Sequence, residues 1–346
     1  MSSTRVARVY RPTPRNLALL AKVLAKGGLV AAPTETVYGL AADALNAKAC
    51  RAIFKAKGRP ANDPLIVHVG TLTQANEIAE LNDAAREVAK AFWPGPLTLV
   101  LPKRPGVPSI VTSGLPSVAV RMPAHRYFRE LIRLSGCPLA APSANPFGYV
   151  SPTTAAHVRE GLGRRIGHIL DGGAAKIGVE STILDLRDPN HPALLRPGAV
   201  SQQELEQVLK TKVAAYHRQV PVDTAAVAPG MLERHYSPRT PLTLTRKFTR
   251  RYAQQAGQDT ALLFMQKPAR ITGPNIFWLS DSRGGLEQAA HHLFDQLRTL
   301  DNGSWSQMHA ELAPGTSALA LAINDRLARA AAKRQKRANL AGPPLA

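Results

Sequence analysis

The sequence has few of the features that would place a protein outside the cell or in a membrane. Its two cysteines, Cys50 and Cys137, lie far apart in apolar or helical context, which excludes a disulfide framework and a thiolate zinc site. No stretch approaches the roughly 20 apolar residues of a membrane span. The first residues, MSSTRVARVY, lack the apolar core of a signal peptide. We therefore expect a cytoplasmic protein without membrane contact.

Aromatic residues make up only 5% of the chain, and no aromatic-rich strand lies beside basic residues. This pattern argues against a platform that stacks RNA bases. No G-x-x-x-x-G-K-[ST] loop occurs, and GLGRRIG at 161–167 has the wrong spacing for a dinucleotide fingerprint. A nucleotide would have to be bound in another way.

Acidic residues are also scarce, with 24 Asp and Glu against 44 Lys and Arg, a formal net charge of +20. The excess of positive charge extends over both halves of the chain. Such a balance favours polyanionic partners such as nucleic acid or nucleotides.

Length and hydrophobic content predict two domains. Up to about residue 212, helical patterns at 16–26, 46–57, 72–81 and 83–92 alternate with short strands such as LTLVLP and SVAVRMP. Several strands are too close together for helical crossovers, which predicts a twisted, mixed sheet. We predict an α/β domain over 10–212, a linker over 213–242, a smaller Rossmann-like α/β domain over 243–337 and a tail over 338–346.

The stretch KAKGRPANDPLIVHV follows a helix that Asn46 caps and Gly58 ends. Lys57 lies in the last helical turn, where a cation can simply offset the helix dipole. Arg59 lies beyond the glycine, so that an anionic ligand explains it better. His68 lies within the next strand, where a lone histidine is more often structural than ligand-binding.

Three further stretches place polar groups at strand ends. PTETVYG, with Thr36, fits either a turn with a helix cap or a site. SVAVRMP places Arg121 in an apolar strand, where a buried guanidinium must find an anion. APSANPFGYVSPT provides Ser143, Asn145 and Ser151 in a loop stiffened by proline.

Together with GVESTILDL, LLRPGAV and PGMLERHYSP, these motifs closely resemble the threonylcarbamoyl-AMP synthases of the YrdC-like group, in the longer form with a C-terminal domain. The resemblance covers about residues 12–200 and PGMLERHYSP. It implies a nucleotidyltransferase that makes threonylcarbamoyl-AMP and pyrophosphate from L-threonine, bicarbonate and ATP, with Mg²⁺ on the nucleotide. It also implies partner proteins that transfer the threonylcarbamoyl group to the tRNA adenosine next to the anticodon, and contact with tRNA.

The resemblance also assigns residues. The catalytic polar group would be Lys57, Arg59, Ser143 and Asn145. ATP would contact Arg59, Asp63, Ser117, Ser143, Ser151, Arg196 and Tyr236. Threonine would contact Thr36, His68, Arg121, the Ala141 backbone and Ser181, with its carboxylate in a fork of Arg121. The metal ligands stay open.

Asp63 stands where the family often has Asn, Lys or His, and its carboxylate needs Arg59 or Mg²⁺ between itself and the phosphates. Residues 213–242 would close over the ligands as a lid, with Tyr236 above them.

Two alternatives remain at this point. The carbamoyl-transfer domain of hydrogenase maturation factors shares the fold, but such proteins carry acylphosphatase-like and zinc-finger segments that this sequence lacks. The net charge of +20 also fits a module that binds tRNA or double-stranded RNA. Such a module would bind tRNA without any dependence on threonine.

Overall fold

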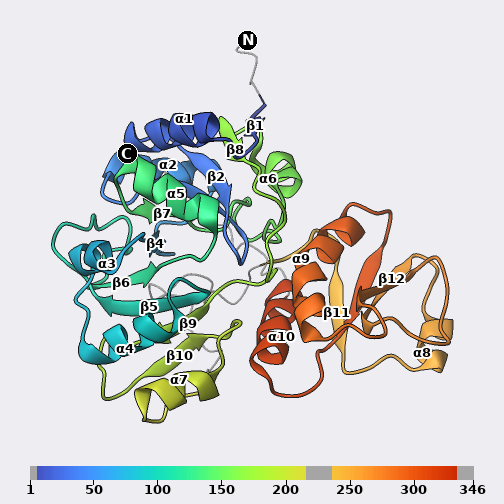
Figure 1. The fold of residues 1–346 in the computed structure, drawn as a ribbon. Helices are drawn as coiled ribbons and strands as arrows, with labels where there is room; N and C mark the ends of the chain where they lie inside the picture. Colours follow the sequence, from blue (N-terminus) through green and yellow to red (C-terminus); the bar gives the residue numbers. More distant parts are fainter. Residues whose placement is uncertain (1–5, 216–235, 333–346) are drawn as a thin grey trace, which may run out of the picture.

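The computed structural model describes residues 6–215 and 236–332, which form two α/β domains (Figure 1). Most of the predicted lid, residues 216–235, and the predicted tail lie outside the described residues. No helix among those described is long and apolar enough to cross a membrane.

The larger domain contains ten strands in one sheet, in the order β1-β8-β2-β3-β7-β4-β6-β5-β9-β10. They are β1 (Arg8–Tyr10), β2 (Val30–Pro33), β3 (Tyr38–Asp43), β4 (Ile66–His68), β5 (Leu97–Pro102), β6 (Ser117–Arg121), β7 (Leu139–Ala140), β8 (His168–Leu170), β9 (Thr182–Asp185) and β10 (Ala193–Arg196). The pairs β4–β6 and β5–β9 are parallel, whereas β2–β3 and β5–β6 are antiparallel. The predicted mixed sheet is confirmed.

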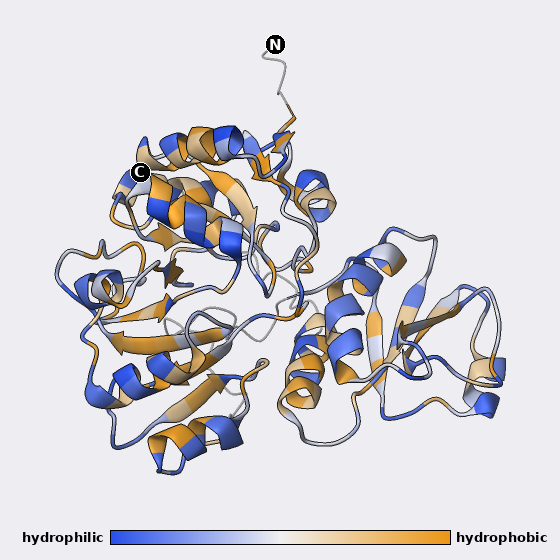
Figure 2. Cartoon of the chain, in the orientation of Figure 1, coloured by the Kyte–Doolittle hydropathy of each residue, from blue (hydrophilic) through white to orange (hydrophobic). Residues whose placement is uncertain are grey.

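Helices cover both faces of this sheet. They are α1 (Pro14–Ala25), α2 (Ala47–Lys57), α3 (Leu72–Ile78), α4 (Asp83–Phe92), α5 (Arg126–Ser135), α6 (Ala155–Leu162) and α7 (Gln202–Leu209). One core includes Ile53, Val88 and Leu99, and a second, between the sheet and the pair α1–α5, includes Leu20 and Phe128. Figure 2 shows the apolar central strands between helices whose outer faces are polar.

Local sequence explains the ends of α1 and α2. Asn46 accepts hydrogen bonds from the Lys48 and Ala49 amides, and Gly58 ends α2 in the left-handed region at φ 65°, as predicted. The prediction for the first helix was wrong at its start. Thr13 caps α1 and Pro14 occupies its first turn, where proline costs no hydrogen bond.

The smaller domain has a four-stranded parallel sheet in the order β11-β14-β12-β13. Its elements are β11 (Leu242–Thr245), α8 (Arg250–Gln255), β12 (Thr260–Gln266), β13 (Ile276–Ser280), α9 (Leu286–Asp301), β14 (Gln307–Glu311) and α10 (Ala318–Ala330). Helix α10 thus ends at Ala330, within the predicted second domain. At the other end of the chain, β1 enters the large sheet two residues before the predicted domain start at residue 10.

Helices α9 and α10 lie on the side of the small sheet that faces the larger domain (Figure 1). One hydrophobic cluster crosses the boundary: Val37 and Val150 of the larger domain pack with Phe294 and Leu327 of the smaller one. Because this contact is apolar and buried, it holds the two domains together next to the loops described below.

Candidate active site

Loops at the ends of several strands of the large sheet enclose a cavity of about 50 Å³. Its walls come from the loop after β2, the start of β3, strands β4, β6 and β10, and the loops before Ser143 and Ser181. Its polar lining residues are Thr34, Thr36, Arg59, His68, Arg121, Ser143, Glu180, Ser181, Arg196 and Tyr236. Three guanidinium groups in one buried cavity make it a strong candidate for binding an anion.

Arg121, at the end of β6, is 3% exposed and lies beside the turn after β2. Its Nη2 donates to Glu35 Oε1 at 2.6 Å, Nη1 to Thr36 Oγ1 at 3.0 Å and Nε to the Gly95 carbonyl at 3.1 Å. The anion that the burial of Arg121 requires is thus provided within the protein by Glu35, and the pairing of Arg121 with a threonine carboxylate stays a prediction. A carboxylate ligand would share Arg121 with Glu35.

The turn that carries Glu35 is stabilised by Thr34. Its hydroxyl accepts from the amides of Thr36 and Val37 and donates to the Val37 carbonyl at 2.7 Å. PTETV thus forms a compact turn between β2 and β3 and not a helix cap. Glu35 Oε2 is buried and has no hydrogen-bond partner among the described residues, which leaves an acceptor near the cavity.

His68, at the end of β4, is 2% exposed, and its ring lies 5.2 Å from the ring of Phe128, centroid to centroid. Burial, and then the neighbouring Arg121, lower the pKa of His68 to about 3, so that the ring is neutral at physiological pH. Its Nδ1 is buried without a hydrogen-bond partner among the described residues. A ligand hydroxyl or ammonium group is the kind of partner that this nitrogen lacks.

The Arg59 side chain is held by residues that follow it closely in the sequence. Its Nε donates to the Asp63 carbonyl at 2.9 Å, its Nη2 donates to the Pro64 carbonyl at 2.6 Å, and Nη2 lies 2.9 Å from Asp63 Oδ1. Asp63 is fully buried, and burial raises the pKa of its carboxyl group. Asp63 does not line the cavity but pairs with Arg59, which does. Arg59 thus stands between the carboxylate and the cavity, the arrangement that an Asp at this position requires.

Lys57 does not line the cavity either; its ammonium group holds the loop that does. Its Nζ donates to the carbonyl of Ser143 and to that of Asn145, the latter at 2.6 Å. Asn145 in turn donates from Nδ2 to the Pro146 and Tyr149 carbonyls. Burial lowers the pKa of Lys57 well below its usual value. Lys57 and Asn145 therefore stabilise the loop without lining the cavity. Of the predicted catalytic residues Lys57, Ser143 and Asn145, only Ser143 lines it.

Arg196, at the end of β10, is 3% exposed. Its Nε donates to the Ser181 carbonyl and its Nη2 to Ser181 Oγ, both at 3.0 Å, and Ser181 Oγ also lies 2.8 Å from Thr98 Oγ1.

Tyr236 closes the cavity on the side of the smaller domain, where its ring packs 5.4 Å from the ring of Phe294. Burial, and then Glu180, raise the pKa of Tyr236 to about 12, so that its hydroxyl keeps its proton.

Glu180 lines the cavity and was not predicted, although the motif GVEST contains it. Ser151, a predicted ATP contact, does not line the cavity; its Oγ donates to Glu180 Oε1 at 2.6 Å. The other carboxylate oxygen lies 2.9 Å from Nε of Arg326 in α10. Ser117 begins β6, at the opposite end of the strand from Arg121, and does not line the cavity.

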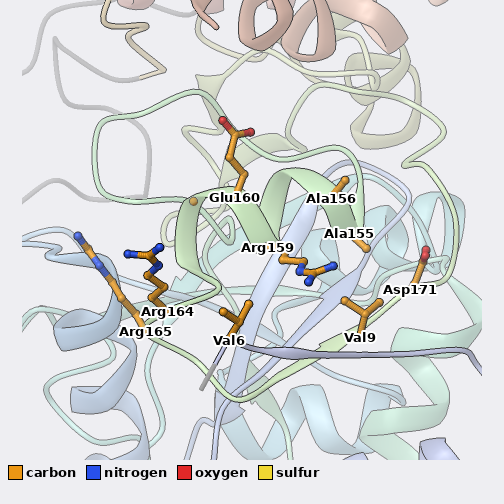
Figure 3. Close-up of a pocket in the computed structure, with 10 residues that line it drawn as sticks. Val6, Val9, Ala155, Ala156, Arg159, Glu160, Arg164, Arg165 and Asp171 are labelled. Atoms are coloured by element: carbon orange, nitrogen blue, oxygen red, sulfur yellow. The ribbon is translucent and has the colours of Figure 1, made fainter. Parts of the chain in front are cut away.

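A separate cavity of about 710 Å³ lies between α6 and β1 (Figure 3). Arg159, Arg164 and Arg165 line it together with Val6 and Asp171. None of the residues predicted for ATP or threonine belongs to it. The candidate site is therefore the smaller, buried cavity.

Fold and site together define a two-domain α/β protein with a buried, arginine-lined cavity on its larger domain. Residues 22–198 match the family model described as "Telomere recombination", and residues 200–332 match the one described as "Threonylcarbamoyl-AMP synthase, C-terminal domain". The chain belongs to the threonylcarbamoyl-AMP synthase family, as its motifs suggested.

Individual relatives agree over nearly the whole length. A threonylcarbamoyl-AMP synthase of Pyrococcus abyssi is 42% identical over 328 residues, which cover 91% of this chain and 94% of the relative. That of Bacillus subtilis is 40% identical over 330 residues, 92% and 93% of the two chains. The crystal structure of P. abyssi Sua5 complexed with L-threonine matches with a TM-score of 0.86 at 38% identity, over 94% of this chain and 97% of that one.

Proposed function

We propose that this protein forms threonylcarbamoyl-AMP and pyrophosphate from L-threonine, bicarbonate and ATP, and that the buried cavity is where it does so. Membership of the synthase family supports the reaction. The observation that carries the location is that three arginines line the same cavity: Arg59 from the loop after α2, Arg121 from the end of β6 and Arg196 from the end of β10. No other cavity described above combines buried arginines with the family motifs.

Threonine fits the end of the cavity formed by Thr36, His68 and Arg121. Arginine has five N–H donors, and three of those of Arg121 are used within the protein, so that a substrate carboxylate can accept from the others. The neutral His68 and the unpaired oxygen of Glu35 suit the hydroxyl and ammonium groups of an amino acid. Ala141 and Ser181 complete this end.

The phosphates of ATP fit the end formed by Arg59, Ser143 and Arg196. These groups are held by the protein before any ligand arrives, so that little reorganisation is needed when negative charge develops. The cavity of about 50 Å³ is much smaller than the several hundred Å³ of a usual nucleotide pocket. ATP binding therefore requires the cavity to widen.

The chemistry needs no protein nucleophile. The neutral amine of threonine attacks CO₂ and loses a proton to solvent or bicarbonate to give an N-carboxylate; when bicarbonate itself reacts, water leaves. An oxygen of this carboxylate then attacks the α-phosphorus, and the bond from that phosphorus to pyrophosphate breaks. The protein contributes by holding the two substrates in line and by placing positive charge around the phosphates.

We treat Mg²⁺ as part of the nucleotide substrate. Among the described residues, no group of three or more His, Cys, Asp or Glu side chains is placed to hold a metal ion. The nearby carboxylates of Glu35, Asp63 and Glu180 each face an arginine. Mg²⁺ bound to the phosphates and water would add to the arginines in neutralising charge.

We further propose that the protein works in the cytoplasm and passes its product to a threonylcarbamoyl transferase that modifies tRNA next to the anticodon. The net charge of +20 supports contact with tRNA during this transfer. The mixed carboxylic-phosphoric anhydride reacts readily with water, which favours direct delivery to a partner over release.

Pyrophosphate release tests the proposal. It should require ATP, threonine and bicarbonate together, and it should fall when any one of them is left out. A protein that binds tRNA with no dependence on threonine and releases no pyrophosphate would instead be an RNA-binding module.

A further inference from the structure

Helix α10 of the smaller domain places an arginine directly behind the candidate active site. Arg326 is fully buried, and its Nε donates to Glu180 Oε2 at 2.9 Å while Nη2 donates to the Glu180 carbonyl at 3.3 Å. Glu180 belongs to the larger domain and lines the cavity. The contact thus joins the two domains through a buried ion pair at the wall of the site.

A carboxylate in that wall is unfavourable for the reaction proposed above, because the ligand is a triphosphate. Within the larger domain, the Ser151 hydroxyl donates to Glu180 Oε1 at 2.6 Å but carries no charge. Arg326 of α10 contacts the Glu180 carboxylate directly, and Arg196 of the larger domain also interacts with its charge. Arg326 also lies 2.9 Å from Asp325, but Asp325 has a second cation, since Arg329 Nε lies 3.1 Å from it.

We propose that Arg326 is a positioning residue for ATP binding: it neutralises and orients Glu180, so that the smaller domain completes the electrostatics of the site without touching the substrate. This proposal rests on the ATP site proposed above. Through Arg326, the smaller domain would then influence how tightly the larger domain binds ATP. Tyr236, which also lines the cavity, has its ring 5.7 Å from the Arg326 guanidinium, so that the same arginine supports a second wall.

The test is a set of dissociation constants for ATP, AMP and adenosine, measured by calorimetry on the full chain. In Arg326→Met, the uncompensated Glu180 carboxylate should repel each ligand in proportion to its charge. We expect the dissociation constant for ATP to rise about 10- to 30-fold, that for AMP to rise less, and that for adenosine to stay nearly constant.

The double variant Glu180→Gln/Arg326→Met removes both charges. It should bind ATP within about threefold of the wild-type protein, since a buried ion pair can often be replaced by neutral groups with little loss. If Arg326→Met alone fails to fold, the double variant can still be measured, because the double variant leaves no buried carboxylate without a cation.

Arg298→Met is the matched control. Arg298 is also a buried arginine of the smaller domain, and its Nη2 donates to the Val150 carbonyl at 2.5 Å, next to Ser151, but it makes no contact with Glu180. Its replacement weakens the same domain boundary and should change the affinities for ATP and adenosine by equal factors.

Three results would overturn the inference. One is an equal loss of affinity for ATP and adenosine in Arg326→Met, which would make the arginine merely structural. Another is a folded double variant that binds ATP as poorly as Arg326→Met. The third is unchanged ATP binding in Arg326→Met while the wild-type protein binds ATP, which would leave the proposed function intact. A wild-type protein that binds no ATP would remove the proposed function, and this inference with it.

Discussion

Replacing Arg121 by lysine keeps the positive charge but removes the geometry on which one end of the site depends. Arg121 donates from three different nitrogens, to Glu35, Thr36 and the Gly95 carbonyl. Lysine has one nitrogen and can keep at most the contact with Glu35 without rearrangement. Two charge-assisted hydrogen bonds in a buried site are lost, so that the free energy of unfolding should fall by about 2–4 kcal/mol.

The same change should affect threonine more than ATP. Because Thr36 loses its donor and Glu35 shifts toward the lysine, the dissociation constant for threonine should rise about tenfold or more, and that for ATP by less than about threefold. Urea unfolding gives the stability change and calorimetry gives the two affinities. Arg133→Lys is the control: Arg133 makes two hydrogen bonds to Glu130 on an exposed surface, and its replacement should change the free energy of unfolding far less than Arg121→Lys does.

Two results would refute these expectations: Arg121→Lys is as stable as the Arg133 control, or the dissociation constants for threonine and ATP rise by the same factor. The first result would mean that the buried hydrogen bonds of Arg121 contribute little. The second would mean that Arg121 supports the cavity as a whole and not its threonine end.

Three further predictions concern neighbouring groups. Arg59→Ala should lower the free energy of unfolding by about 3–5 kcal/mol by leaving Asp63 without its cation, and adding Asp63→Asn should restore at least half of this in urea unfolding. Between pH 7 and pH 5 only the unfolded state protonates the His68 ring, so that the wild-type protein should lose about 2 kcal/mol of its free energy of unfolding through this group as the pH falls. In His68→Asn this part of the loss should be absent. Lys57→Met should increase amide hydrogen exchange in the loop around Ser143, while Lys55→Met, an exposed position two residues earlier in α2, should not.

The elements that could be predicted from the sequence are those whose signals are local. Helix α2 carries its cap, its apolar face and its terminal glycine within the helix and the two flanking residues. Strand β7, by contrast, has two residues and exists because β3 and β4 flank it in the sheet. No pattern within so short a segment can indicate a strand.

The site shows the same division. The sequence located Arg59 because it lies beyond the glycine that ends a helix, and Arg121 because it lies in an apolar strand, whereas Arg196 came from the resemblance to the family. The partners that lie far away in the chain were not visible: Glu35 is 86 residues from Arg121, and Arg326 is 146 residues from Glu180. Which carboxylate neutralises which arginine depends on the register of a mixed sheet and on domain packing, and neither follows from local pattern.

A crystal structure with L-threonine, Mg²⁺ and a non-hydrolysable ATP analogue tests the central claim most directly. We predict threonine beside Thr36, His68 and Arg121, and the phosphates beside Arg59, Ser143 and Arg196, with the threonine nitrogen facing the α-phosphate. Ligands bound instead in the cavity of about 710 Å³ beside Arg159, or a threonine held far from the α-phosphate, would contradict this account.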